Sequence, residues 1–146
     1  MGREVTPRFD RRRSTPAGAA ALRTVVIDDS RPLRALARAH LEVDGGFVVV
    51  GEGSDGASGI EAVRRHRPAV VLLDIRMPGM DGFAALPRIR ELVPAAYIVV
   101  HSSLDPSEAA GRAHAMGADA YLMKDACAAL PDRLRSLLAP LQRRSA

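Results

Sequence analysis

The sequence has few of the features that mark secreted or membrane proteins. It contains a single cysteine, Cys127, so no disulfide can form within the chain and nothing points to an oxidising compartment. No apolar run approaches the roughly 20 residues that a membrane-spanning helix needs. The N-terminus is basic but lacks the apolar stretch of a secretory signal. We therefore expect a cytoplasmic protein without a membrane partner.

Lysine is also nearly missing. Of the 21 lysine and arginine residues, Lys124 alone is a lysine. An ammonium group is a compact point charge, whereas a guanidinium is a planar fork, and the two are not interchangeable. The single lysine therefore indicates either chance or a position that needs a point charge. Its neighbours decide between these readings.

What is present is ordinary for one globular domain. The chain has 146 residues, of which 47% are hydrophobic and 26% charged. Residues 1–22 carry five arginines against Glu4 and Asp10, a net +3 of the total +4. We expect a flexible basic arm over 1–22, a folded domain over 23–140 and a frayed end over 141–146. The arm holds a single aromatic residue, Phe9, and no recognisable motif of a nucleic-acid reader, so we do not expect this chain alone to bind nucleic acid.

Five short apolar runs alternate with helical patterns after the arm. Because the runs are apolar throughout, they predict a parallel sheet covered on both faces. Five units are too few for an eight-stranded barrel, which leaves an α/β, doubly wound (βα)5 flavodoxin-like fold with strand order 2-1-3-4-5. Pro87 lies inside the third helical pattern and predicts a kink or a restart there. The expected strands are 24–27, 47–50, 69–73, 97–100 and 119–123, and the last helix is expected from about Pro131 to about Pro140.

Three carboxylates directly follow two of these strands. Asp28 and Asp29 follow the first strand, and Asp74 follows the third. These strands are neighbours in the expected order, and ligands bind outside the carboxyl ends of such strands. Close carboxylates must take up protons or a cation, and oxygen ligands select Mg²⁺, with Mn²⁺ or Ca²⁺ as substitutes. The alternative explanation for these three residues is structural: Asp28 and Asp29 would cap the first helix, and Asp74 would be a loop residue without a ligand.

Two more strand ends carry polar side chains. Ser102 follows the fourth strand, and Lys124 follows the fifth. A phosphoryl group on Asp74 would need its charge neutralised and a hydroxyl donor nearby, which these residues offer. A local turn at Ser102 and a solvated surface position for Lys124 are the simpler explanations.

Taken together, these segments resemble the receiver domain of bacterial response regulators, over residues 23–140. The segments that carry the resemblance are Val25-Val26-Ile27-Asp28-Asp29, Leu72-Leu73-Asp74-Ile75-Arg76-Met77-Pro78-Gly79-Met80-Asp81-Gly82, Ile98-Val99-Val100-His101-Ser102-Ser103 and Gly117-Ala118-Asp119-Ala120-Tyr121-Leu122-Met123-Lys124-Asp125. Asp125 stands where many receivers have proline, and this form is most similar to the nitrate-response subfamily.

The resemblance implies a role for each site residue. Asp74 would be the phosphoacceptor in a Mg²⁺-dependent transfer from a sensor histidine kinase or a phosphotransfer protein. Asp29 would bind the metal directly, Asp28 mainly through water, and the backbone carbonyl of Arg76 would be a further ligand. Lys124 would pair with the phosphoryl oxygens.

The resemblance also implies a switch. Ser102 would move toward the phosphoryl group, and Tyr121 would follow inward. The surface of the fourth helix, fifth strand and fifth helix would then control a downstream partner protein. Arg76 and Leu104 would flank the attacking water. Leu104 offers that water no hydrogen bond, which predicts slow self-dephosphorylation.

The alternatives come from different functional classes. A receiver cut from a DNA-binding regulator would normally carry a C-terminal output domain, which this sequence does not include, and phosphorylation could then drive a homodimer. A Mg²⁺-dependent phosphohydrolase would need a substrate pocket and a second acid or base, so we do not expect an enzyme. An inactive pseudo-receiver would be expected to lack one of the acids or the lysine, and all are present.

Overall fold

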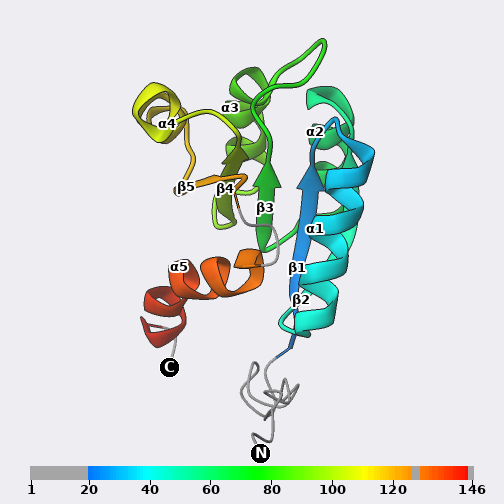
Figure 1. The fold of residues 1–146 in the computed structure, drawn as a ribbon, viewed down its shortest axis with the longest axis vertical. Coiled ribbons are helices and arrows are strands. Elements are labelled where there is room, and N and C mark those ends of the chain that lie inside the picture. The colour runs from blue at the N-terminus through cyan, green and yellow to red at the C-terminus, as the bar shows by residue number, and fades with distance from the viewer. Residues whose placement is uncertain (1–19, 126–128, 145–146) are drawn as a thin grey trace, which may run out of the picture.

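The computed structural model describes residues 20–125 and 129–144 (Figure 1). The predicted basic arm and Cys127 lie outside these residues, apart from the arm's last three positions. Within the described part, five parallel strands form one sheet in the order β2-β1-β3-β4-β5, as predicted. No helix of that part is long and apolar enough to cross a membrane. The strands are β1 (Leu22–Ile27), β2 (Phe47–Gly53), β3 (Val70–Leu73), β4 (Tyr97–Ser102) and β5 (Ala120–Met123).

Five helices among the described residues cover the two faces of this sheet. Successive residues of a strand point to opposite faces, so each central strand contributes to two separate cores. Val25 and Ile27 pack with α2, α3 and α4, whereas Val26 between them packs with α1 and α5. This explains why the strands are apolar throughout. The helices are α1 (Arg31–Asp44), α2 (Gly56–His66), α3 (Gly82–Leu92), α4 (Pro106–Ala115) and α5 (Leu130–Arg144).

Strand β2 is longer than the sequence predicts. The prediction placed a loop from Gly51, but Gly51–Gly53 continues the strand and pairs with Val25–Ile27 after a register shift that skips Val50 of β2. A Cβ atom at Gly53 would lie 2.5 Å from the Cα of Gly59 on α2. Glycine is therefore required here by the close approach of a helix to the strand, which is a different cause from the loop that was predicted.

Two helices continue through a proline. Helix α3 is one helix across Pro87, so the restart offered as one of the two predicted outcomes does not occur, and α5 runs beyond its predicted end at Pro140 to Arg144. Each proline removes one backbone donor. Both prolines lie on the exposed side of their helix. Packing of the opposite, buried face keeps each helix intact.

At the edge of the sheet opposite the carboxyl ends of the strands, Arg90 joins three segments. Its guanidinium donates to the carbonyls of Ala96 (2.8 Å) and Gly117 (2.7 Å) and to the Asp119 carboxylate (2.6 Å). Asp119 also accepts the backbone N–H of Ile98 at 2.8 Å. The end of α3, the start of β4 and the α4–β5 connection are thereby held together.

Candidate functional site

The turn after β1 holds two acidic residues in different environments. Asp28 is 5% exposed, and its carboxylate accepts the Ser30 backbone N–H at 2.9 Å. Ser30 in turn is the N-cap of α1 and accepts the N–H of Leu33. The adjacent Asp29 is exposed, and none of the hydrogen bonds or ion pairs among the described residues involves its carboxylate. One acid is thus fixed, and its neighbour is available to a ligand.

Asp74 follows β3 and is held through its backbone. Its N–H donates to the carbonyl of Ile27 at 2.8 Å, which places it beside the end of β1. The loop after it is fixed by the N–H of Gly82, which donates to the carbonyl of Ile75 at 2.8 Å. A Cβ atom at Gly82 would collide with the Asp74 carbonyl oxygen and lie 2.7 Å from the Cα of Ile75. The start of α3 therefore packs directly against the backbone that presents Asp74.

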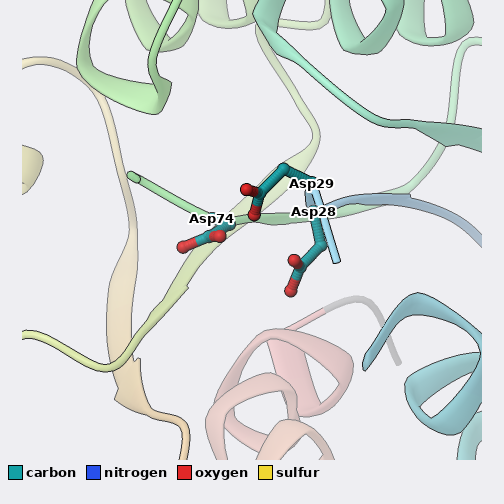
Figure 2. A group of neighbouring side chains, drawn as sticks. All are labelled: Asp28, Asp29 and Asp74. Atoms are coloured by element: carbon teal, nitrogen blue, oxygen red, sulfur yellow. The ribbon is translucent and has the colours of Figure 1, made fainter. Parts of the chain in front are cut away.

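Figure 2 shows the three carboxylates gathered where β1 and β3 end. One oxygen from each of Asp28, Asp29 and Asp74 can be chosen so that all three lie within 4.8 Å of one another. The prediction that residues about 45 positions apart meet at this edge is thereby confirmed. Such a group of oxygen ligands is suited to a hard divalent cation.

Lys124 lies between two of these acids. Its ammonium nitrogen is 2.5 Å from Asp28 Oδ2 and 3.1 Å from Asp74 Oδ2. Its side chain is only 10% exposed, so the surface explanation for this lysine is wrong. The N–H of Lys124 also donates to the carbonyl of Ser102, which ties the end of β5 to the end of β4.

Burial and charge perturb the ionisation of the site. Burial raises the pKa of Asp74 to about 6; the charge of Lys124 opposes this rise, and the charges of Asp28 and Asp29 add to it. Burial alone would lower the pKa of Lys124, but its bonds to Asp28 and Asp74 outweigh that effect and raise it. Burial and then the charge of Lys124 lower the pKa of His101 to about 4, so this histidine is neutral near pH 7.

The two predicted switch residues interact with one loop. Ser102 is fully buried, and its hydroxyl accepts the N–H of Leu104 at 3.1 Å. The Tyr121 hydroxyl donates to the carbonyl of Leu104 at 2.9 Å. Both side chains therefore hold the connection between β4 and α4, and neither is bonded to the carboxylates in this structure.

Two cavities open beside the carboxylates. One of about 350 Å³ is bounded by the three acids, Lys124 and Ser103, among others. The neighbouring cavity, of about 500 Å³, is bounded by Asp29, Arg76, Leu104 and Arg112, among others. The guanidinium of Arg112 lies 4.0 Å from the centre of the Phe83 ring in its wall. Arg76 borders both cavities, so the two residues predicted to flank an attacking water do stand beside the acidic group.

Sequence reasoning missed two residues that support the site. Arg34 donates to the backbone carbonyl of Asp28 at 2.6 Å, and Gly82 allows the close approach to Asp74. A glycine at a helix start was the available signal for the second. Nothing in the spacing of Arg34 distinguishes it from the other arginines of α1.

Residues 24–135 match the family model described as the response regulator receiver domain. The chain belongs to this family. The match covers the sheet except the first two residues of β1, and it includes the acidic group and Lys124. The receiver domain is not itself a catalytic unit, and it works with histidine kinases or phosphotransfer proteins and with output domains.

Named relatives carry the same domain in longer proteins. The chain is 39% identical over 101 residues to the nitrate/nitrite response regulator NarL of Escherichia coli, covering 69% of this chain and 47% of the relative. It is 38% identical over 114 residues to a protein-glutamate methylesterase/protein-glutamine glutaminase of Maricaulis maris, covering 77% of this chain and 28% of the relative. The chain thus spans a quarter to a half of these relatives.

Solved structures agree. The signal receiver domain of a putative NarL from Mycobacterium tuberculosis is 36% identical, with a TM-score of 0.69, over 73% of this chain and 86% of that one. A LuxR-family response regulator from Aurantimonas is 29% identical, with a TM-score of 0.75, over 82% of this chain and 86% of that one. The predicted receiver fold and its place in two-component signalling are confirmed.

Proposed function

We propose that this receiver accepts a phosphoryl group on Asp74 from a sensor histidine kinase or a phosphotransfer protein. The observation that carries the proposal is the position of Lys124, whose ammonium lies within 3.1 Å of the acceptor carboxylate and bonds to a second acid beside it. This places a point charge where the oxygens of a phosphorylated Asp74 would accumulate negative charge.

The transfer needs an ionised Asp74 and a route for the leaving group. An Asp74 carboxylate oxygen attacks phosphorus, the new O–P bond forms as the histidine N–P bond breaks, and the imidazole keeps the electron pair and takes up a proton. Because burial raises the pKa of Asp74 to about 6, the carboxylate is mostly ionised at pH 7 and remains a usable nucleophile.

The acidic group fits a magnesium ion. Asp29 has a free, exposed carboxylate, Asp28 is held for a water-mediated contact, and the Arg76 carbonyl is proposed as a further ligand. When bound, Mg²⁺ would neutralise charge on the transferring phosphoryl group. Mn²⁺ or Ca²⁺ could take the same oxygen ligands.

The output would follow from the loop between β4 and α4. When the Ser102 hydroxyl turns to a phosphoryl oxygen, it gives up the N–H of Leu104, and this loosens the carbonyl that Tyr121 holds. We propose that Tyr121 then turns inward and that the face of α4, β5 and α5 changes for a downstream partner or an output domain.

A phosphohydrolase acting on external substrates has less support. Charged and apolar side chains line the two cavities beside the acidic group, and neither lining includes a histidine. His101 at this edge is buried, and burial lowers its pKa to about 4. His101 is therefore not suited to act as a general acid or base near neutral pH.

Intact-protein mass after incubation with acetyl phosphate and Mg²⁺ tests the proposal. We expect one added phosphoryl group on the wild type, none on Asp74→Asn, and none when the metal is chelated. Asp105→Asn is the matched control, because Asp105 is an exposed helix cap outside the site, and it should be phosphorylated normally. An adduct that persists in Asp74→Asn would refute the assignment.

A further inference from the structure

Asp29 is the member of the acidic group with the least support from its own side chain. Asp28 is fixed by the Ser30 N–H and by Lys124, whereas the Asp29 carboxylate has no bonded partner among the described residues. A metal ligand on a turn must nevertheless be held close to its productive position, because misplacement weakens binding. The support for Asp29 has to come from its backbone.

The backbone on the N-terminal side of Asp29 is held by an arginine. The peptide between Asp28 and Asp29 is planar, so the carbonyl of Asp28 and the N–H of Asp29 turn as one unit. Arg34 donates to that carbonyl at 2.6 Å from one turn into α1. The bond therefore sets the orientation of the peptide plane from which the Asp29 side chain leaves.

Arg34 is itself fixed from β2. Its side chain is 16% exposed, and its Nε lies 3.4 Å from Glu52 Oε1. The second oxygen of Glu52 pairs with Arg38 at 2.8 Å. Glu52 thus holds two arginines of α1, of which Arg34 is the one that the structure bonds to the acidic turn.

We propose that Arg34 is a positioning residue for the metal site, acting through the Asp28–Asp29 peptide and set in place by Glu52. The inference rests on the proposed magnesium binding by the acidic group. It predicts the direction in which Mg²⁺ affinity changes when Arg34 is removed. Arg34 is a cation near a cation site, so if only charge mattered, removing it would tighten Mg²⁺ binding. If it positions Asp29, removing it weakens binding.

The test is isothermal titration calorimetry of Mg²⁺ into the full chain. Arg34→Met keeps the length of the side chain but removes its donors, and we expect the Mg²⁺ Kd to rise on the order of tenfold, as for other residues that orient metal ligands. Arg34→Lys keeps one donor and should recover most of the affinity. Arg38→Met is the matched control, since it removes a cation and a Glu52 pair without touching Asp28, and its Kd should stay within about twofold of the wild type.

Denaturant unfolding without metal separates positioning from stability. Arg34→Met and Arg38→Met each lose a pair with Glu52, so a purely structural role would appear in unfolding and leave the Mg²⁺ Kd unchanged. An unchanged or tighter Kd for Arg34→Met, or no recovery in Arg34→Lys, would overturn the inference alone. A wild type that binds no Mg²⁺ would overturn the proposed metal-dependent function as well.

Discussion

Lys124 lies closer to Asp28 than to Asp74, the proposed acceptor, with distances of 2.5 Å and 3.1 Å from its ammonium nitrogen. Before phosphorylation the lysine therefore serves mainly as the partner of a buried acid. A phosphoryl group on Asp74 would carry more negative charge than the carboxylate does. Its oxygens would then compete with Asp28 for the ammonium group of Lys124.

Replacing Lys124 by methionine should slow phosphorylation. We expect the rate with acetyl phosphate to fall on the order of tenfold or more, because a positioned charge on the developing phosphoryl oxygens is lost. Time-resolved intact mass measures the rate. Arg64→Met, which removes a cation paired with exposed Glu61 on α2, is the control and should react at the wild-type rate. Equal rates for the two variants would contradict the role of Lys124.

Replacing Gly82 by alanine should destabilise the fold. The added methyl group would collide with the backbone at Asp74 and Ile75, and overpacking of this kind costs about 3 kcal/mol where backbone must move. Gly111→Ala in α4 is the opposite case, since its Cβ would meet nothing within 4 Å and the helix should gain about 0.5–1 kcal/mol. Urea unfolding measures both changes, and a stable Gly82→Ala would refute the close packing.

The metal-free protein should lose stability as pH rises through the pKa of Asp74. Folding raises that pKa from 3.8 to about 6, so the folded state favours the protonated acid. The contribution of Asp74 to the free energy of unfolding is fully present below about pH 4 and is lost as the pH rises through about 6. Asp74→Asn should remove this pH dependence and be about 1–2 kcal/mol more stable at pH 7, since water reaching the group reduces the full effect.

Asp105 is the control, because folding lowers the pKa of its carboxyl instead of raising it. Hydrogen bonds from Ser107 lower the pKa of its carboxyl, so its contribution is present above the ordinary pKa and is lost as the pH falls. Asp105→Asn should therefore not become more stable at pH 7. Thermal unfolding between pH 3 and 8, with the metal chelated, measures both variants. A similar pH dependence for Asp74→Asn and the wild type would exclude Asp74 as its source.

Leu104→Glu should shorten the lifetime of the phosphorylated protein. Leu104 and Arg76 border the same cavity next to Asp29, and leucine gives an attacking water no hydrogen bond. A carboxylate there can orient that water, and we expect dephosphorylation about tenfold faster or more. Leu104→Met is the control of similar size and should leave the rate unchanged. Decay of the mass adduct after removal of the donor provides the measurement.

Much of the site follows from the sequence because it is built at strand ends. In a parallel sheet the carboxyl ends of neighbouring strands share one edge, so residues following apolar runs are brought together whatever their separation in the chain. That reasoning placed Asp28, Asp29, Asp74 and Lys124 correctly. Their roles in phosphorylation and metal binding remain predictions.

The errors came where packing overrides local preference. Gly51–Gly53 was taken for a loop, although the glycines allow α2 to lie against β2. A restart at Pro87 and a helix end near Pro140 were considered, but both helices continue, because burial of the opposite face outweighs one missing bond. Arg34 was overlooked because no periodicity reveals which arginine of a helix reaches back to the preceding turn.

The Arg90 bonds at the far edge of the sheet determine how α4 can respond. They immobilise the connection at the C-terminal end of this helix, through the Gly117 carbonyl and Asp119, whereas its N-terminal end begins at the loop that Ser102 and Tyr121 hold. If phosphorylation shifts the loop before α4, the displacement would be largest at the first turn of this helix and smallest at its C-terminal end. A partner that binds the first turn of α4 would therefore be the most sensitive to phosphorylation.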